Sequence, residues 1–374
     1  MKLVASISQG LEKEGAQELI ELGAKEVKAS KRHIFLEADM ACLYRLHLKS
    51  RLSFRFLREV YNFPCHSPHE LYRGIQRAID WEKWLNPSKS FRVDVTGFSE
   101  GLSHTHYTAL QVKNAIIDLQ REVWGLRSSI NVSNPDICFH LHLANNQAVF
   151  SVDGCHSSLH KRGYRPAVGM APIKETLAAG LMRMTAWDGT KNLVDPLCGS
   201  GTLLIEAVSN LLGIASGIDR KFLFMNWPDF DKSIWERELQ MAKKVKTFNV
   251  KLPKIIGCEI DEKIANSAAH NVKQAGLENY IQIINCPFQE LHLPSGLGLL
   301  ICNPPYGIRI GDENQLPNLY KQLGEYCKNK ASGWDLWLLN GNPKLSKNIG
   351  MKANRRFQVN NGSIDCRWLN YKIK

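Results

Sequence analysis

Four consecutive residues, Asn303, Pro304, Pro305 and Tyr306, carry the clearest chemical signal in this sequence. They follow an apolar run, residues 297–302, which is typical of a buried strand that ends at Asn303. The two prolines hold the backbone extended and remove two amide donors. The Asn303 side-chain oxygen and the Pro304 carbonyl can then accept hydrogen bonds from an exocyclic amine, while Tyr306 stacks on its ring. Such a site aims the nitrogen lone pair at an electrophile without a strong base.

A turn with coincidental prolines is the alternative interpretation of these four residues. Their position directly after an apolar strand favours a functional role. The motif resembles that of amino-group methyltransferases, which act on adenine, guanine or glutamine amides.

A second motif follows another short strand. Residues 192–194 lead into the sequence Asp-Pro-Leu-Cys-Gly-Ser-Gly-Thr at 195–202, and an apolar helix is expected at 203–212. A strand, a glycine turn and a helix in this order are typical of the nucleotide-binding start of a doubly wound sheet. The glycines allow close approach of a ligand, and the aspartate can accept hydrogen bonds from an ammonium or hydroxyl group. The candidate cofactor-binding residues of the turn are Asp195, Cys198, Gly199, Gly201 and Thr202.

The glycine pattern restricts the kind of nucleotide. A dinucleotide-binding turn needs a third glycine where Leu204 stands, and the Gly-Lys-Ser/Thr of a phosphate-binding loop is absent. A cofactor without a pyrophosphate remains, and S-adenosylmethionine fits.

Two later strands supply further cofactor candidates. Glu259 ends the strand at 254–258 and can accept hydrogen bonds from both ribose hydroxyls. Asp261 is a weaker candidate, and both carboxylates would also suit the start of the following helix. Methyltransferases of this type usually carry an aspartate near Pro287, which this sequence lacks. Phe288 is therefore expected to pack on the purine and to offer its backbone N–H to a ring nitrogen.

Composition indicates a nucleic-acid partner. The formal net charge is +12, the pI is about 9.2, and the basic excess extends through both halves of the chain. A long polyanion explains this distribution, although a merely basic soluble protein is the alternative. No apolar run reaches membrane-spanning length and no signal-peptide pattern is present, so we expect a cytoplasmic protein. The ten cysteines form no Cys-x-x-Cys pair, so neither a metal site nor a disulfide framework is expected.

The N-terminal half contains the candidate RNA contacts. Residues 1–65 are expected to form a small α+β subdomain and residues 66–155 a compact α/β domain. Basic residues interleave with apolar ones at 43–60, a segment that fits a helix or, in its second half, a strand. Two interpretations of these basic residues are open: they contact RNA phosphates, or they form a solvated face over a core. The linker at 156–170 is polar and basic and is interrupted by Gly and Pro. The RNA-binding candidates are Arg51, Arg55, Thr105, Tyr107, Lys113, Lys161, Arg162 and Arg165.

Longer runs of the sequence resemble known families. The order RVDV, SHTHYTALQVKNAIID, NPDICFHLHL and AVFSVDG is similar to a THUMP domain, an RNA-binding module of tRNA and rRNA modification enzymes. The runs RGYRPAVGMAPIKETLAA, DPLCGSGTLLIEA, FLFMNWPDF, NPPYGIRIG and NGSIDC resemble the bacterial 23S rRNA guanine-N2 methyltransferases of the L type. Some members carry a second domain that methylates guanine N7, and we expect that activity to be absent here.

The resemblance implies a Rossmann-like class I methyltransferase domain at 171–374, preceded by an α+β, THUMP-containing RNA-binding region with a ferredoxin-like subdomain. It also implies S-adenosylmethionine as cofactor, 23S rRNA as partner, and a monomer or weak dimer without membrane or metal. The insertion at 213–253 is expected to be a packed helical lid or covering layer. A tRNA guanine-N2 methyltransferase, an adenine-N6 methyltransferase and a non-catalytic RNA-binding protein remain as alternatives.

Overall fold

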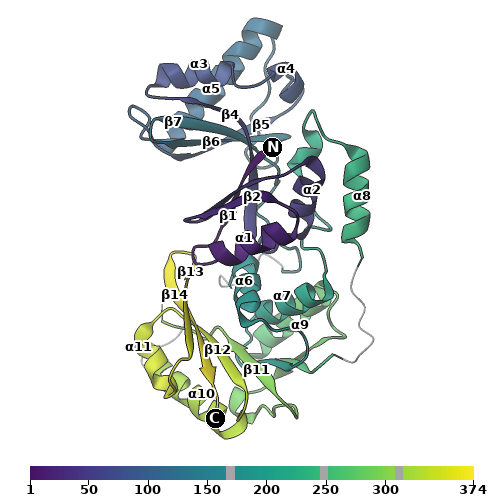
Figure 1. The fold of residues 1–374 in the computed structure, drawn as a ribbon, viewed down its shortest axis with the longest axis vertical. Coiled ribbons are helices and arrows are strands. Elements are labelled where there is room, and N and C mark those ends of the chain that lie inside the picture. Colours follow the sequence, from purple (N-terminus) through teal and green to yellow (C-terminus); the bar gives the residue numbers. More distant parts are fainter. Residues whose placement is uncertain (166–172, 245–251, 308–314) are drawn as a thin grey trace. The chain divides into compact units, whose positions relative to one another are not determined.

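The computed structural model describes residues 1–165, 173–244, 252–307 and 315–374, and they form two compact units (Figure 1). The first unit contains Met1–Ser6, Leu19–Leu159 and Gly217–Met241. The second contains Ile7–Glu18, His160–Ser216 and Ala242–Lys374. Two segments depart from the domain boundaries expected from the sequence. Residues 7–18 belong to the second unit, and residues 217–241 belong to the first. The end of the expected linker, at 166–170, lies outside the described residues.

The described part of the first unit contains one sheet of seven strands, in the order β2-β3-β1-β4-β7-β6-β5. Strands β5 and β6 run parallel, whereas β7 runs antiparallel to both β6 and β4. The strands are β1 (Lys2–Ile7), β2 (Lys25–Ser30), β3 (His33–Glu37), β4 (Ser53–Pro64), β5 (Phe91–Gly97), β6 (Ile137–Ala144) and β7 (Gln147–Asp153). The helices are α2 (Met40–Lys49), α3 (Pro68–Gln76), α4 (Trp81–Trp84) and α5 (Thr105–Trp124).

The segment at 43–60 is part helix and part strand. Asp39 caps α2, since its side chain accepts a hydrogen bond from the Cys42 backbone N–H at 2.7 Å. The helix ends at Lys49, and the chain then enters β4, which pairs with β7. The strand alternative for the second half of this segment is confirmed.

Residues 217–241 contribute an aromatic layer to the first unit. They include the 3-10 helix η1 (Leu223–Asn226) and the start of α8 (Lys232–Ala242). Phe224 and Trp235 pack around Tyr44 of α2, with ring centroids 4.9 and 5.7 Å from the tyrosine. Tyr44 also accepts a hydrogen bond from the Asp231 N–H at 2.9 Å. This part of the insertion is a structural covering layer.

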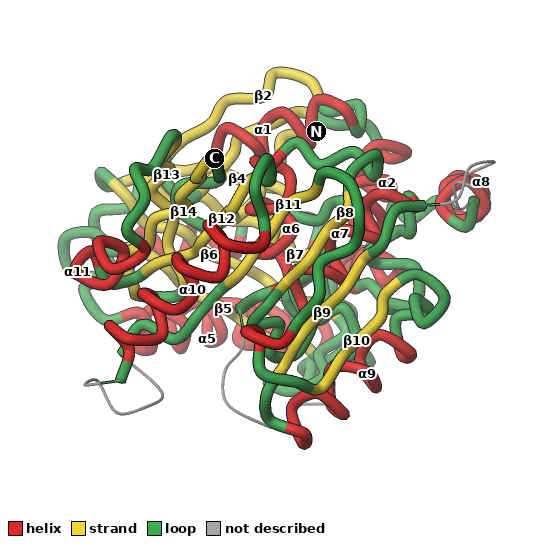
Figure 2. The backbone as a smooth tube through the Cα atoms, turned by 90° about the horizontal axis from the view of Figure 1, so that it is seen from below, coloured by secondary structure: helices red, strands yellow, loops and turns green. Residues whose placement is uncertain are grey.

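The described part of the second unit contains another seven-stranded sheet, in the order β10-β9-β8-β11-β12-β14-β13 (Figure 2). Parallel pairing joins β10, β9, β8, β11 and β12. Strand β14 is antiparallel to β12, and β13 is antiparallel to β14. The strands are β8 (Asn192–Asp195), β9 (Ile255–Glu259), β10 (Ile281–Asn285), β11 (Gly298–Cys302), β12 (Asp335–Asn340), β13 (Arg355–Asn361) and β14 (Ile364–Lys372). The helices are α6 (Glu175–Thr185), α7 (Thr202–Leu212), α9 (Glu262–Gln274), η2 (Phe288–Glu290), α10 (Leu316–Lys330), α11 (Pro343–Ser346) and η3 (Lys347–Ile349).

Packing explains why residues 7–18, which include the start of α1 (Glu12–Glu21), belong to the second unit. Leu11 is fully buried against Gly180 of α6, where a Cβ atom would lie 2.4 Å from Leu11 Cδ1. Glu14 and Arg183 form an ion pair at 3.4 Å on the same helices. Only a glycine lets α6 approach this leucine so closely.

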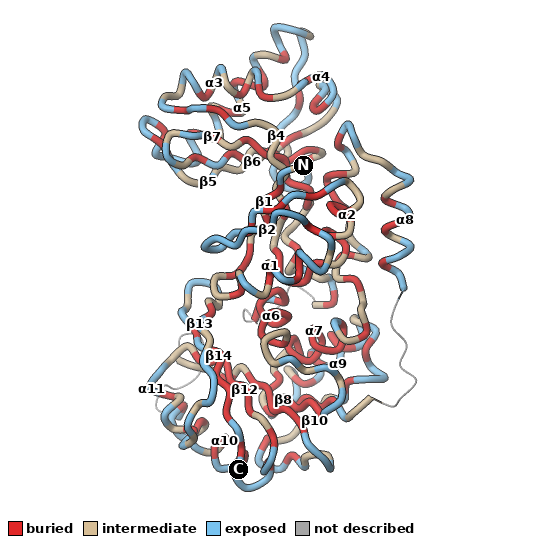
Figure 3. The backbone as a smooth tube through the Cα atoms, viewed as in Figure 1, coloured by how far each residue is buried: buried red, intermediate tan, exposed pale blue. Residues whose placement is uncertain are grey.

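Burial follows the strands. Every residue of β8 and β11 is buried, as expected for central parallel strands covered on both faces (Figure 3). Among the described residues, no helix has the length and apolar character needed to cross a membrane.

Candidate active site

The sheet of the second unit places the two sequence motifs at one edge. Asp195 pairs in register with Gly257, so Glu259 lies just beyond it on the neighbouring strand β9. On the other side of β8, Val194 pairs with Leu300 of β11, which ends at Cys302. The carboxyl ends of parallel strands meet at the same edge, where ligands of such sheets bind. Asp195, Glu259 and Asn303 therefore converge, as the sequence predicts.

The glycine turn is held in a left-handed conformation. Gly199 and Gly201 have φ angles of +51° and +75°, which a residue with a side chain rarely adopts. The Gly199 N–H donates to Glu259 Oε2 at 3.1 Å, and the Cys198 N–H donates to the Cys258 carbonyl at 2.9 Å. Glu259 thus fixes the turn from the neighbouring strand.

Asp261 has a different role from Glu259. Its side chain caps α9, because it accepts hydrogen bonds from the Lys263 N–H at 2.8 Å and the Ile264 N–H at 3.1 Å. The helix-start interpretation is therefore correct for Asp261, whereas Glu259 remains at the strand end as a ribose candidate.

Asp195 is a buried carboxylate, 1% exposed, that accepts a hydrogen bond from the Leu197 N–H at 3.1 Å. Burial, with a smaller contribution from Glu259, raises the pKa of Asp195 to about 8. It forms no ion pair with any described residue. A bound ammonium group would supply the missing positive charge and favour the ionised form.

Asn303 presents an unused acceptor. Its Oδ1 atom is buried, and within the described part of the chain no donor lies within hydrogen-bonding distance. Buried side-chain oxygens normally have partners, so an exception needs an explanation. An amine of a bound substrate would provide one. Pro304 is buried and Pro305 half-buried beside it.

Tyr306 is positioned by residues that sequence reasoning missed. Asn361, at the end of β13, donates from Nδ2 to the tyrosine hydroxyl oxygen at 2.8 Å. A Cβ atom at Gly341 would lie 2.8 Å from Tyr306 Cδ2, so this glycine makes room for the ring. Asn361 falls within the run NGSIDC that resembles the L-type family, and that run was the one available signal.

Replacing Asn361 by alanine should lower turnover about three- to tenfold, because one hydrogen bond to the stacking tyrosine is lost. Tyr306→Phe should give a similar loss. The double variant should lose less than the product of the two single losses, since both single changes remove the hydrogen bond between Asn361 and Tyr306. Single-turnover rates at saturating substrate would measure the effect, and additive losses would show that Asn361 acts elsewhere.

Phe288 has little surface available to a ligand. Its side chain is buried in the core, and its ring meets Tyr326 edge-on with centroids 5.6 Å apart. The packing of this ring on a purine therefore stays a prediction, and its 4% exposure leaves little of the ring for that contact. Its backbone N–H also remains a candidate, next to Pro287 at the cap of η2.

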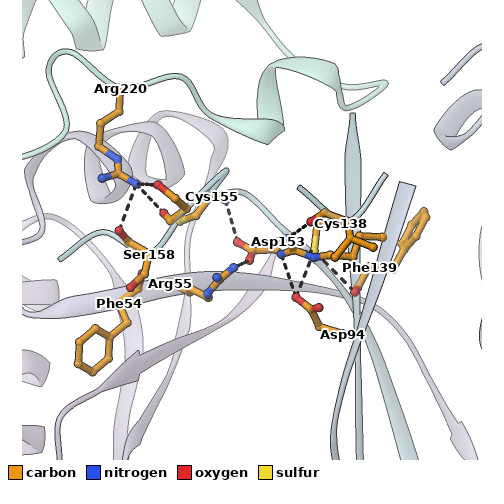
Figure 4. A network of polar contacts seen from close by, with 12 residues as sticks. Phe54, Arg55, Asp94, Cys138, Phe139, Asp153, Cys155, Ser158 and Arg220 are labelled. Atoms are coloured by element: carbon orange, nitrogen blue, oxygen red, sulfur yellow. Dashed lines mark hydrogen bonds and ion pairs between the residues drawn. The ribbon is translucent and has the colours of Figure 1, made fainter. Parts of the chain in front are cut away.

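The structure opposes direct RNA contact by Arg51 and Arg55. Arg51 is 6% exposed. Arg55 is ion-paired with the buried Asp153, which also accepts a hydrogen bond from the Cys155 N–H at 2.7 Å (Figure 4). Burial raises the pKa of Asp153, and the arginine opposes this by stabilising the charged form. Arg51 therefore belongs to the interior of the first unit, whereas Arg55, whose side chain is 31% exposed, is neutralised by its ion pair with Asp153.

The arginines of the linker are also engaged internally. Arg162 lies 3.6 Å from Glu206, with side chains 5% and 1% exposed. Arg165 is paired with Glu175 at 2.7 Å and donates to Thr202 Oγ1 at 3.3 Å, so it supports the glycine turn. Both expectations of RNA contact are corrected by this burial. Lys161 is exposed and remains a candidate.

The remaining RNA candidates lie on α5 of the first unit. Thr105 and Tyr107 are exposed in its first turn, and Lys113 is partly exposed two turns later. Phe98, which follows β5, is 71% exposed, and sequence reasoning did not single it out. Exposed aromatic rings are platforms on which bases stack.

Comparison with known proteins defines the class. The whole chain superimposes on SMU.472, a candidate methyltransferase solved in complex with SAH, with a TM-score of 0.89 and 28% identity, over 98% of that chain. Models for an RlmL ferredoxin-like domain and a THUMP domain match residues 2–57 and 65–153. The protein therefore has a Rossmann-like class I methyltransferase domain preceded by a THUMP-containing region.

The family follows from the remaining matches. Residues 162–370 match the model described as "RMKL-like, methyltransferase domain". A candidate RNA methyltransferase of Synechocystis sp. is 41% identical over 99% of this chain and 96% of its own length. This chain belongs to the RMKL-like methyltransferase family. It is also 35% identical to the ribosomal RNA large subunit methyltransferase K/L of Syntrophotalea carbinolica, but spans only 54% of that protein.

Proposed function

We propose that this protein transfers a methyl group from S-adenosylmethionine to the exocyclic N2 amine of a guanine in 23S rRNA. The observation that supports the proposal most directly is the buried, unpartnered Asn303 Oδ1 at the edge of the sheet where Asp195 and Glu259 also lie. The choice of guanine N2 and of 23S rRNA rests on the sequence resemblance and on the K/L relatives.

The residues of the sheet edge fit this cofactor. Asp195 would hold its ammonium group, Glu259 its ribose hydroxyls, and the backbone of Gly199 and Gly201 its amino-acid portion. A buried carboxylate without a cationic partner and a glycine turn tied to Glu259 are the structural features that such a ligand completes. When bound, the cofactor supplies an electrophilic methyl group on a sulfonium.

The chain's own residues position the target amine. The base leaves its stack to enter the site. Asn303 Oδ1 and the Pro304 carbonyl then accept its two N–H groups, and Tyr306 stacks on the ring. This arrangement directs the nitrogen lone pair and requires no strong base, since the amine becomes acidic once its nitrogen is cationic. We expect positioning of this kind to supply most of the rate enhancement over the uncatalysed methyl transfer.

The first unit is proposed to bind the RNA. Thr105, Tyr107 and Lys113, with Lys161, are accessible candidates for phosphate and base contacts. Such binding should weaken steeply with salt, because each phosphate contact releases counterions.

Affinity for S-adenosylmethionine should rise as the pH increases from 6 towards 8, by up to tenfold per unit. The pKa of Asp195 is raised to about 8 by burial, so below this value the free protein holds a proton that the bound ammonium expels. By the same linkage, the protonated carboxyl stabilises the free protein at low pH, and this stability is lost as the pH rises through 8.

Isothermal titration calorimetry in buffers of different ionisation enthalpy would detect proton release on binding. Asp195→Asn should bind more weakly and lose this pH dependence. An unchanged pH profile in that variant would show that another group titrates.

Nucleoside mass spectrometry tests the proposed function. The rRNA and tRNA of a strain without the gene should lack one N2-methylguanosine in 23S rRNA, and the wild-type gene should restore it where Asn303→Ala does not. If N6-methyladenosine were missing instead, the protein would be an adenine-N6 methyltransferase. If the missing modification were in tRNA, its substrate would be tRNA. A complete, unchanged modification profile would favour a non-catalytic RNA-binding protein.

A further inference from the structure

The hairpin formed by β13 and β14 carries two arginines that the proposed chemistry does not use. Arg356 and Arg367 line a cavity of about 440 Å³ together with Gly10, Phe357 and Gln358. Both arginines are exposed, and neither forms an ion pair with a described residue. The cavity lies entirely within the second unit.

The register of the hairpin brings the two guanidinium groups to one face. Gln358 pairs with Arg367, and Arg356 pairs with Leu369. Alternate residues of a strand share a face, so Arg356 and Arg367 are diagonal cross-strand neighbours, with Cβ atoms roughly 7–8 Å apart. Two like charges at this separation without a carboxylate partner repel each other unless an anion lies between them.

Protection of an exposed sheet edge is the alternative explanation, because charged residues on edge strands deter aggregation. The edge of β13 is already covered in this protein. The Asn360 N–H donates to the Gln9 carbonyl at 3.0 Å, and a Cβ atom at Gly10 would lie 2.1 Å from the Gln358 carbonyl oxygen. The chain segment at Gly10 therefore forms one wall of the cavity and leaves the arginines without a role in edge protection.

The same hairpin is connected to the reactive motif. Arg367 pairs in register with Asn340, the last residue of β12, which lies at the carboxyl edge of the sheet. Asn361, at the tip of the hairpin, hydrogen-bonds Tyr306. Since β12 separates β14 from β11, Arg367 lies two strand spacings, roughly 10 Å, across the sheet from the strand that ends at Asn303.

We propose that the cavity lined by Arg356 and Arg367 is a phosphate-binding site for the RNA strand that carries the target base, within a few nucleotides of that base. This inference rests on the proposed function. The arginines bind the phosphodiester through charge-assisted hydrogen bonds and fix the strand, while Asn361 of the same hairpin holds the stacking tyrosine. The site thus couples the position of the backbone to the position of the base.

The test compares Arg356→Gln and Arg367→Gln with Arg355→Gln. Arg355 is the matched control, because it is exposed, precedes Arg356 on the same strand, points to the opposite face and does not line the cavity. The probe is 23S rRNA from a strain that lacks the gene. Each cavity variant should lower RNA affinity about tenfold at low salt. Each should also reduce the slope of log affinity against log salt by about 0.7, the contribution of one contact to a single strand.

Phosphate-ethylation interference locates the contact. Wild-type protein and Arg355→Gln should show interference at a phosphate close to the methylated nucleotide, and both cavity variants should lose it. Equal behaviour of all three variants would overturn the proposal. Binding and interference are measured without methyl transfer, so a failure of the proposed function appears separately as a wrong or missing methylated nucleoside. Thermal unfolding and S-adenosylhomocysteine affinity should be unchanged in all variants.

Discussion

Replacing Asn303 by alanine should reduce turnover by about two to three orders of magnitude. The variant removes the acceptor for the target amine, and losing one positioned polar group in an active site has an effect of this size. The fold should tolerate the change, because Oδ1 makes no hydrogen bond within the described structure and the residue lies at a strand end. Single-turnover assays on 23S rRNA, with the product nucleoside identified by mass spectrometry, would measure it.

The control for this prediction is Asn303→Asp, which keeps an acceptor oxygen and should retain more activity than the alanine variant. Affinities for S-adenosylmethionine and RNA should change little in both variants. Near-normal turnover of Asn303→Ala would require a different mechanism, and an N6-methyladenosine product would require a different substrate.

Replacing Glu259 by alanine should weaken binding of S-adenosylmethionine by about 1–3 kcal/mol, the cost of charged hydrogen bonds lost. The effect has two sources. Glu259 is the candidate acceptor for the ribose hydroxyls, and its Oε2 also accepts the hydrogen bond from Gly199 that holds the turn. Isothermal titration with the cofactor gives the affinity directly.

Asp261→Ala is the matched control, because this carboxylate is two residues away and only caps α9. It should lower the free energy of unfolding by about 1 kcal/mol through loss of the cap and leave cofactor affinity unchanged. Equal losses of affinity in the two variants would show that Glu259 is not the specific acceptor of the ribose hydroxyls.

The convergence of the three motifs at one sheet edge was predictable because their signals are local. The turn after β8, the acidic residue after β9 and the motif after β11 each follow a buried strand, and parallel strands bring their carboxyl ends together. The partner of Tyr306 was not predictable in this way. Asn361 lies 55 residues later, and only the pairing of β13 with β14 brings it to the tyrosine.

Charge was the least reliable guide. Arg55 and Arg162 fit a basic RNA-binding pattern in sequence, but each is paired with a buried carboxylate, Asp153 or Glu206. The sequence lists the charges without showing which of them are neutralised. Arg356 and Arg367 illustrate the converse, because their importance appears only when the cavity between them and Gly10 is known.

The interleaving of the two units has a consequence for biosynthesis. The first unit lacks its aromatic layer until residue 241 has left the ribosome, and the second needs both residues 7–18 and the C-terminal strands. Until then, apolar surface around Tyr44 of α2 stays uncovered in the nascent chain, because Phe224 and Trp235 are not yet available to pack on it. Exposed apolar surface of this kind promotes aggregation of folding intermediates. The protein should therefore fold late in its synthesis and depend on chaperones during most of it.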